Sequence, residues 1–507
     1  MLIEVAGAVL LILALNTIYR YVSSRGALPH PPGPPGDFII GNLRQMPLTY
    51  PWHVFTQWGQ KYGPLTYLNV AGQPMIVINT QEAAMDLLDK KTAIYSDRPR
   101  FVMAAELAGM ESIIVFLRSG ALHKKYRKLV AQTLGPRSVE RDFVPLRELY
   151  THQLALAFLD DPVNFLDHIE RCMGKTITTI AYGVHDPDVV ELGRKTMMHF
   201  SKLSQGYLVD FLPWLRYIPE WFPGAQFQKD AKLAKETYAQ ARWVPYNRVV
   251  EKVKNGTAPT SFVSSALEAM KTAQADEVNA DIISSSAFTL IGGGTETSSV
   301  SIMSFILAMI LYPDVQARAQ EELDRVVGDN LPTIASRDST PYLNAIVTET
   351  LRWHPSFPIG FPHSVSQDDV YNGYLIPART TIIVNAWGIL HDERHYPDPF
   401  RFNPERFIPN GDGKEAPVDP WAVAFGYGRR ICQGIPMAQS GLWIVMATLL
   451  SSFDFRQKLD PVTKKPMVTK PEFSGGSISR PLPFVCDIVP RSARHAERIR
   501  EAVSEGT

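Results

Sequence analysis

The sequence predicts a mainly α-helical protein with small β-sheets, in which an N-terminal transmembrane helix precedes one globular domain. Three stretches carry the clearest helical periodicity: residues 315–327, 343–353 and 437–455. Strand-like sequence surrounds turn signals at Gly72-Gln73, within residues 67–79, and at Asn372-Gly373, within residues 370–384. Because no second linker and no internal repeat follows Phe38, we expect these elements to share a single core.

Composition narrows the class of protein. The chain has 507 residues, 45% of them hydrophobic, which is enough to bury a large core. Its formal net charge is zero, so nucleic acid is not expected as a partner. Three cysteines, Cys172, Cys432 and Cys486, are too few for a disulfide framework in so long a chain and suit a reducing compartment.

The N-terminus differs from the rest of the chain. Apolar sequence runs unbroken from Val5 to Leu15 and continues, past two polar residues, to Val22, and a helix of about 20 residues can cross a bilayer. Arg20 and Arg25 lie at its far end, which by the positive-inside rule places the following domain in the cytoplasm. The start lacks the basic region of a cleaved signal peptide, so we expect residues 1–22 to be a retained, single-pass membrane anchor.

A proline-rich hinge, residues 23–37, follows the anchor. Proline fixes φ and removes a backbone donor, so neither a helix nor a sheet can run through this segment. We expect the hinge to set the orientation of the globular domain, residues 38–507, against the membrane.

One long helix is expected from a cap at Asn279 to a stop at Pro313. Three glycines, 292–294, lie in its middle, and each costs about 1 kcal/mol relative to alanine. We infer that they open space beside the backbone, on the face that Thr289, Gly293 and Thr297 share. The alternative is a pair of helices broken at the glycines.

A cysteine in a glycine-containing, basic loop is the strongest single signal for chemistry. The pattern F-x-x-G-x-R-x-C-x-G is formed by Phe425, Gly428, Arg430, Cys432 and Gly434. An apolar helical run follows at once, and a helix N-terminus with nearby arginines favours a thiolate. A thiolate can bind a soft or borderline metal, including haem iron. The alternative is a structural cysteine buried in a turn.

Together these motifs resemble the cytochrome P-450 (haem-thiolate monooxygenase) family, of the microsomal type and in the style of basidiomycete fungal secondary-metabolism members. The resemblance implies the cytochrome P-450 fold and haem b, with Cys432 as the axial ligand of the iron. It also implies that Glu296 and Thr297, in the G-x-E-T-S segment of the long helix, are the acid and alcohol that relay protons for dioxygen chemistry.

The same resemblance assigns roles to residues whose local sequence is less specific. Glu349 and Arg352 (E-x-x-R) with Arg406 would form a structural cluster behind the cysteine loop. Partners for the haem propionates would be Arg430, His363 and Arg127, with His123 standing where the family has tryptophan. Walls of the substrate pocket would include Phe288, Thr289, Gly293, Ile359 and Ile478.

The function implied is insertion of one oxygen atom from O2 into an apolar small molecule, at the endoplasmic reticulum membrane. No G-x-G-x-x-G follows a predicted strand, so electrons would come from NADPH-cytochrome P-450 reductase, with cytochrome b5 as an optional second donor. A terpenoid and an indole or other aromatic metabolite both remain open as substrates.

Three alternatives remain: a haem-thiolate isomerase or dehydratase that does not use O2, a non-enzymatic haem sensor, and a zinc protein using His391 and His395. A further open point is the lysine-rich segment 124–128, which is either a solvated helix face or a docking surface for an acidic reductase.

Overall fold

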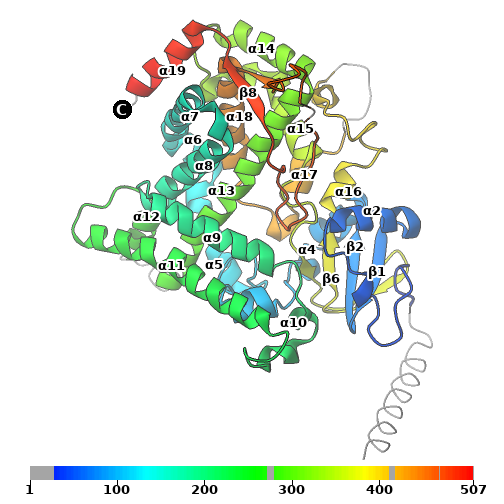
Figure 1. Cartoon of the computed structure of the whole chain (residues 1–507). Helices are drawn as coiled ribbons and strands as arrows, with labels where there is room; N and C mark the ends of the chain where they lie inside the picture. Colours follow the sequence, from blue (N-terminus) through cyan, green and yellow to red (C-terminus); the bar gives the residue numbers. More distant parts are fainter. Residues whose placement is uncertain (1–27, 271–278, 410–416, 468, 506–507) are drawn as a thin grey trace, which may run out of the picture.

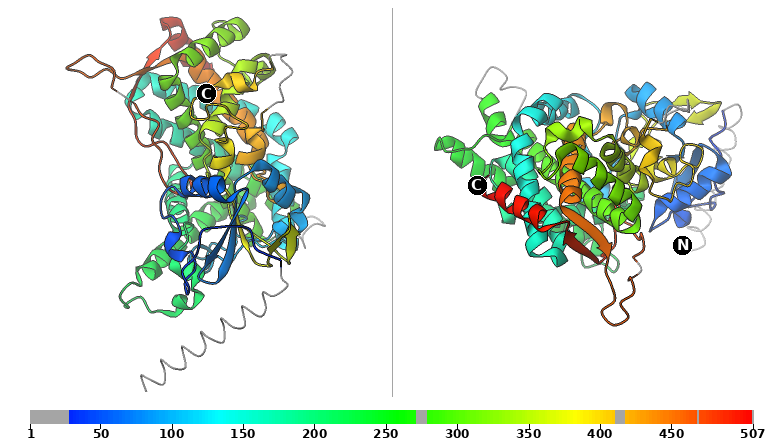
Figure 2. Two further views of the ribbon diagram at one scale, coloured as in Figure 1. Left: turned by 90° about the vertical axis from the view of Figure 1, so that its right-hand side faces the viewer. Right: turned by 90° about the horizontal axis from the view of Figure 1, so that it is seen from above.

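A computed structural model describes residues 28–270, 279–409, 417–467 and 469–505. Helices make up most of the molecule, and a small sheet lies to one side of them, near the point where the described chain begins (Figures 1 and 2). The expected membrane anchor, residues 1–22, and the first part of the hinge lie outside the described residues.

The α-helices include α13, which runs through the middle of the helical part (Figure 1). Their bounds are α2 Pro51–Tyr62, α3 Gln81–Ala84, α4 Thr92–Tyr95, α5 Ala121–Leu134, α6 Pro136–Asp142, α7 Val144–Asp160, α8 Phe165–Tyr182, α9 Pro187–Leu203, α10 Leu208–Phe211, α11 Gln226–Lys254, α12 Phe262–Ala269, α13 Ala280–Leu311, α14 Pro313–Val327, α15 Pro341–Trp353, α16 Ala386–Leu390, α17 Pro420–Ala424, α18 Ile435–Ser452 and α19 Ala493–Glu505. Short or irregular helical turns are η1 Leu43–Gln45, η2 Met85–Lys90, η3 Val102–Leu107, η4 Pro162–Asn164, η5 Pro213–Tyr217, η7 Ile334–Ser339, η8 Pro404–Phe407 and η9 Gly428–Arg430.

The strands form one four-stranded sheet, in the order β1-β2-β6-β3, and two hairpin-like pairs, β4-β5 and β7-β8. Their bounds are β1 Leu65–Val70, β2 Gln73–Ile78, β3 His363–Ser364, β4 Asp369–Tyr371, β5 Tyr374–Ile376, β6 Thr381–Val384, β7 Phe453–Gln457 and β8 Cys486–Pro490. The β1–β2 pair is antiparallel and β2–β6 is parallel. The expected turn at Asn372-Gly373 is present, and both residues adopt positive φ, as a tight hairpin between β4 and β5 requires. The first turn lies one residue earlier than expected, at Ala71-Gly72, because Gln73 already pairs with Val70.

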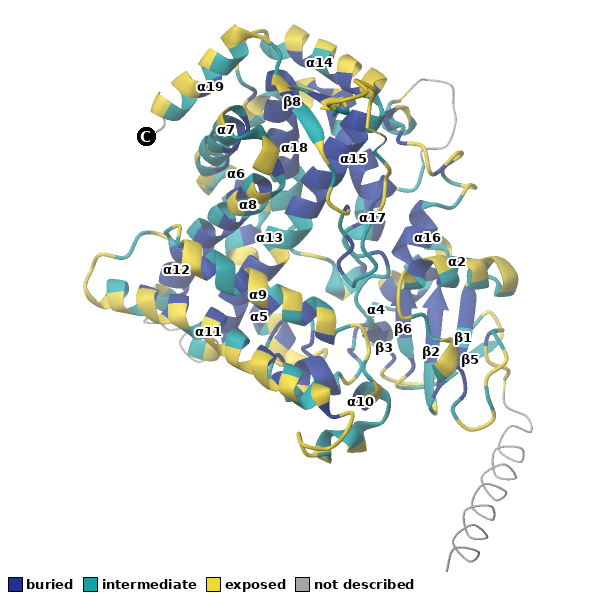
Figure 3. Cartoon of the chain, in the orientation of Figure 1, coloured by how far each residue is buried: buried dark blue, intermediate teal, exposed yellow. Residues whose placement is uncertain are grey.

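The main core is formed by α7, α8, α13, α14, α15 and α18. Figure 3 shows α13, α15 and α18 as mostly buried, while α11 and α14 are exposed along their outer faces. Within the described residues, α13 and α18 are long and apolar enough to span a membrane, but both are largely buried in the protein. Their apolar character therefore follows from their central position, since a helix that is covered on all sides needs no polar face.

Most expected elements are confirmed, but one helix is shorter than expected at its C-terminal end. The helix expected over 437–455 ends at Ser452, and Phe453–Gln457 is strand β7, in which Phe453 and Phe455 point into the core as alternate residues of a strand do. Helix α13 continues through the three glycines, so the alternative of two broken helices is wrong. Its N-cap is the expected Asn279, whose side chain accepts from the backbone N–H of Ile282.

Candidate haem-thiolate site

The loop that carries Cys432 is held closed by its own backbone. The N–H of Cys432 donates to the carbonyl of Phe425 at 2.8 Å, and the N–H of Gly434 donates to the Cys432 sulfur at 3.3 Å. Gly428 has a φ of +52°, and a Cβ there would lie 2.4 Å from the carbonyl oxygen of Leu88. The glycine is therefore required, because any side chain would clash with the backbone of η2.

The Cys432 sulfur faces an internal space. Its side chain is accessible, yet burial is the largest influence on its thiol and raises its pKa. The Gly434 N–H and the charge of Arg127 oppose this rise. The protein alone therefore does not favour the expected thiolate, and a bound metal ion, whose charge deprotonates a coordinating thiol, would have to complete the shift.

A second accessible surface lies inside the protein on α13. Gly293 is exposed although it is in the middle of this core helix, and a Cβ on it would have no neighbour within 4 Å. By contrast, a Cβ on Gly292 would lie 2.7 Å from Met197 Sδ, and one on Gly294 would lie 2.9 Å from Ile177. The outer two glycines thus let α9 and α8 approach closely, and the middle one opens space.

A cluster of buried cationic side chains lies beside the cysteine loop. Arg430 donates to the carbonyls of Ser96 and Leu117, both at 2.7 Å, but its Nη1 has no partner among the described residues. Arg98, which sequence reasoning missed, is also buried; its Nη1 donates to the carbonyls of Phe361 and Pro362, and its Nε has no partner there. Two buried, unpaired guanidinium N–H groups fit an anionic group such as the two propionates of haem.

Two expected histidines belong to this cluster. His123 is buried on α5, and burial together with Arg430, Arg127 and Arg98 lowers its pKa to about 3. His363 is buried on β3, with Nδ1 2.8 Å from the carbonyl of Tyr95, and burial and Arg98 lower its pKa far below the usual range. Both rings are neutral in this cationic surrounding. His123 can offer its one N–H to an anion, whereas the one N–H of His363 lies on Nδ1 and donates to the Tyr95 carbonyl.

Arg127 makes two contacts with the cysteine loop that the sequence did not predict. Its Nη1 donates to the carbonyl of Ile431 at 2.8 Å, and Gln433 Nε2 donates back to the carbonyl of Arg127 at 2.7 Å. These two bonds fasten α5 to the cysteine loop on both sides of Cys432. Arg127 therefore supports the loop directly, whatever it also offers to a propionate.

The expected structural cluster is present. Glu349 and Arg352, on one face of α15, have side chains with no exposed surface and form a bidentate pair at 2.6 and 2.8 Å. Arg406 lies 3.6 Å from Glu349 Oε1, which also accepts from the backbone N–H of Asn403 at 2.7 Å. Arg352 further donates to the carbonyls of Leu390 and Pro399. The cluster thus ties the segment that follows α16 to α15.

Glu296 and Thr297 point to different surroundings. The Thr297 hydroxyl donates to the carbonyl of Gly293 at 2.5 Å, on the accessible face of α13. Glu296 is mostly buried, and its Oε1 accepts from Arg480 Nη2 at 2.8 Å. The structure therefore does not join the two side chains by a hydrogen bond among the described residues.

Apolar side chains next to this part of α13 form an aromatic cluster. The ring centroid of Phe116 lies 5.1 Å from that of Phe101, 5.6 Å from that of Phe200 and 5.5 Å from that of Phe361. Phe200, on α9, was not foreseen, because nothing in its helical pattern separates it from core. Of the expected pocket residues, Thr289 is half-buried on the face of Gly293, and Phe288 packs on Tyr238. Ile359 is half-buried and Ile478 is buried.

The two histidines considered for zinc have other contacts. His391 stacks on Trp387, with centroids 4.0 Å apart, and His395 lies 3.4 Å from Glu82. Within the described part of the chain, no group of three or more His, Cys, Asp or Glu side chains is arranged to hold a metal ion. A metal bound through Cys432 would need most of its other ligands from a cofactor, as haem provides.

Comparisons with known proteins agree with this site. A family model described as cytochrome P450 matches residues 31–484. The chain is 38% identical to cytochrome P450 monooxygenase 208 of Postia placenta, over all of this chain and 98% of that protein. It is 37% identical to cytochrome P450 monooxygenase claR of Ampulloclitocybe clavipes, over 96% of this chain and 91% of the relative. The chain belongs to the cytochrome P450 family, its cofactor is haem, and it is a P450 monooxygenase.

Proposed function

We propose that this P450 is a membrane-anchored enzyme of fungal secondary metabolism that hydroxylates or epoxidises an apolar small molecule. The observation that carries the proposal is the accessible backbone of Gly293, in the middle of a core helix whose Phe288 packs with Phe116 and Phe200 in one apolar cluster. Such a space admits a substrate without offering it charged anchors. The matched relatives from basidiomycete fungi support the biological setting.

Haem, when bound, supplies an iron centre that activates dioxygen and that a cysteine sulfur makes more electron-rich. Cys432 would hold the iron, and Arg98, Arg430 and His123 would hold the propionates, with Arg127 and His363 beside them. The aromatic cluster keeps water away from the reacting carbon. The Thr297 hydroxyl, oriented by the Gly293 carbonyl, is placed to hold and pass on a proton at its Oγ.

The cysteine assignment is tested by Cys432→Ala, with Cys172→Ala as a matched control. Cys172 is buried, and its sulfur donates to the carbonyl of Tyr150 inside the core, whereas Cys432 is accessible. We expect the first variant to lose the red-shifted carbon monoxide band of the reduced protein and the second to keep it. An unchanged band in Cys432→Ala would reject the ligand.

The reaction class and substrate are tested by co-expression with a fungal NADPH-cytochrome P-450 reductase against a panel of terpenes and indoles, read by mass. We expect a gain of one oxygen atom that requires both reductase and O2. An isomerisation or dehydration that needs neither would support the alternative enzyme, and haem binding without any turnover would support a sensor.

An electron donor can approach the cysteine loop from α5. Arg127 and Gln433 join this helix to the loop, so the exposed Lys124 and Lys128 of α5 and the exposed Arg429 lie near Cys432. We infer that this basic face docks the acidic reductase, with cytochrome b5 as a second donor. Charge reversal at Lys124 should raise the KM for reductase without changing the carbon monoxide band.

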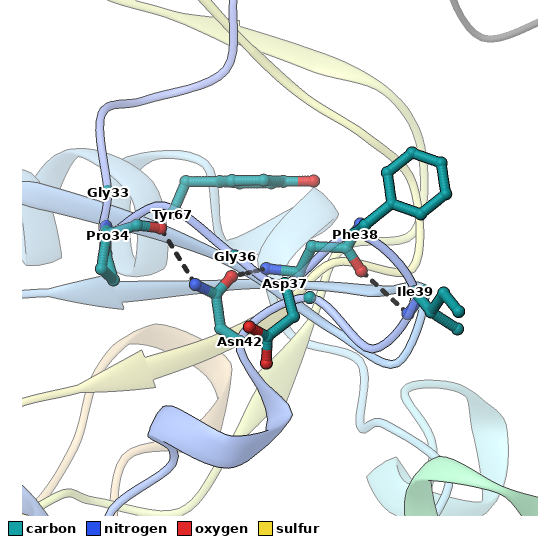
Figure 4. Close-up of a pocket in the computed structure, with 11 residues that line it drawn as sticks. Gly33, Pro34, Gly36, Asp37, Phe38, Ile39, Asn42 and Tyr67 are labelled. Carbon is teal, nitrogen blue, oxygen red and sulfur yellow. Dashed lines mark hydrogen bonds between the residues drawn. The ribbon is translucent and has the colours of Figure 1, made fainter. Parts of the chain in front are cut away.

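Exposed apolar residues support attachment to the endoplasmic reticulum membrane. Figure 4 shows a shallow pocket of about 280 Å³ formed by the hinge and the residues after it, with Phe38 and Ile39 on its outer side; these two are 77% and 70% exposed. Gln73, the first residue of β2, donates to the backbone of α10, after which Trp214, Tyr217 and Trp221 are also exposed. Large exposed aromatic groups on adjoining segments are typical of a membrane-contacting surface.

The membrane part of the proposal is tested by removing residues 1–21. We expect the truncated protein to keep its haem and to bind vesicles more weakly. Adding Trp214→Ser and Trp221→Ser should release it further. Binding that neither change weakens would overturn this part of the proposal.

A further inference from the structure

The guanidinium of Arg480 links two helices, α13 and α8. Arg480 lies in the segment before β8, and its Nη2 donates to Glu296 Oε1 of α13 at 2.8 Å. Its Nη1 donates to Glu170 Oε1 of α8 at 2.9 Å. Arg480, between the two carboxylates, is the most exposed of the three side chains at 38%, Glu170 is 26% exposed, and Glu296 on α13 is the least exposed at 16%. The second oxygen of Glu296, Oε2, is buried and has no partner among the described residues.

The segment that carries Arg480 is fastened to α13 at this point. The N–H of Ser479 donates to the carbonyl of Ser356 at 3.0 Å, and the Ser356 hydroxyl donates to the carbonyl of Thr297 at 3.1 Å. Ser479 Oγ donates to the carbonyl of Ser474, so it accepts from His354 Nε2, 3.0 Å away. Burial lowers the pKa of His354 to about 3, so this contact does not titrate near neutral pH. Arg480 is therefore held in one place relative to Glu296.

The geometry also separates the two members of the acid–alcohol pair. Consecutive residues of a helix point in different directions, and Thr297 faces the accessible side of Gly293. Glu296 instead points to Arg480 and α8. The orientation of the Glu296 carboxyl is therefore set from outside α13, by Arg480.

We propose that Arg480 is a positioning residue for Glu296, and that Glu170, Arg480 and Glu296 form the solvent-side end of the route by which protons reach the accessible face of α13. The inference rests on the proposed monooxygenase function. It assigns Arg480 a part in coupling, the use of electrons for product in place of peroxide, and no part in binding substrate.

The charges around Glu296 give the sign of the expected effects. Burial raises the pKa of Glu296, Arg480 opposes the rise, and Glu170 adds to it. Arg194, on α9, also interacts electrostatically with Glu170. Removing the charge of Arg480 should therefore raise the pKa of Glu296 further, and removing that of Glu170 should lower it.

The first test measures peroxide released per NADPH oxidised, across pH, in the haem-loaded enzyme with reductase. For Arg480→Gln we expect product formation to fall by about tenfold, with more peroxide, an unchanged KM and a normal carbon monoxide band. The acid limb of the pH profile should move up in Arg480→Gln and down in Glu170→Gln. Arg480→Lys should restore much of the coupling. Wild-type coupling in Arg480→Gln, or limbs that move in the same direction, would overturn the proposal.

The second test does not depend on turnover. A double-mutant cycle of Arg480→Gln and Glu296→Gln, read as the urea midpoint of unfolding, reports their interaction directly. At pH 8 we expect a favourable interaction free energy between Arg480 and Glu296. This interaction should be lost as the pH falls through the pKa of Glu296, because only the ionised carboxylate attracts Arg480. No coupling at any pH would overturn the inference even if the enzyme proves to be a monooxygenase. If Arg480 and Glu296 interact in this test but the protein shows no O2-dependent turnover, only the proposed function is refuted.

Discussion

Replacing Glu349 by glutamine should separate the effect of burial from that of geometry in a glutamate–arginine pair. The chain contains a matched pair, Glu191 and Arg194, with the same spacing and the same bidentate contacts, at 2.7 and 2.8 Å. The side chains of that pair are 44% and 46% exposed, whereas those of Glu349 and Arg352 are fully buried. The two substitutions, Glu349→Gln and Glu191→Gln, therefore change the same chemical group in two different environments.

The expected magnitudes differ by several-fold. Glu349→Gln leaves Arg352 charged, with no water to solvate it and only carbonyl oxygens as partners. Removing one member of a buried ion pair costs about 3–5 kcal/mol. An exposed pair contributes only about 0.2–1 kcal/mol, because water replaces the lost partner. Since a folded domain is stable by about 5–15 kcal/mol, the buried substitution alone could leave the protein marginal.

The measurement is the urea concentration at half-unfolding of the haem-bound protein, read by pulse proteolysis for the two variants and the wild type. We expect a large fall in the midpoint for Glu349→Gln, together with lower haem content after purification, and almost no change for Glu191→Gln. Equal shifts in the two variants would refute the argument that burial, and not the salt bridge itself, makes this cluster essential.

Three further predictions concern the site. Thr297→Ala should keep the carbon monoxide band but divert electrons to peroxide, because the hydroxyl bonded to Gly293 is lost; tightly coupled turnover would contradict its proton role. Arg98→Gln should lower haem affinity, measured by transfer to apomyoglobin, whereas Arg100→Gln, at an exposed residue paired with Glu106, should not. Gly293→Ala should stabilise α13 by up to about 1 kcal/mol in thermal unfolding while narrowing the substrate space, and a loss of stability would show that the space is closed.

The sequence was sufficient for most of the fold because its signals are local. Asn279 as a cap, the Asn372-Gly373 turn and the periodicity of α14 and α15 each depend on residues close in the chain. The boundary at Ser452 was missed because β7 is defined by its pairing with β8, about 35 residues later, and an apolar run alone does not separate helix from strand.

The site was predictable where a spacing defines it and not elsewhere. Cys432 and Arg430 lie in one short pattern, so the sequence alone already places them in the same loop. Arg98 has no such pattern: the neighbouring Arg100 has the same side chain and is exposed, and only the fold determines which of the two is buried. Arg480 was missed for the same reason, since its partner Glu296 is 184 residues away in the sequence.

The three glycines of α13 lower the stability of the helix, and packing in the protein explains two of them. Each weakens the helix by about 1 kcal/mol relative to alanine. Gly292 and Gly294 have a structural reason, because Met197 and Ile177 occupy the space that their side chains would need. Gly293 has no such neighbour, so packing within the protein does not explain it. We propose that the haem or its substrate would occupy the space beside Gly293, which would account for a glycine that packing within the protein does not require.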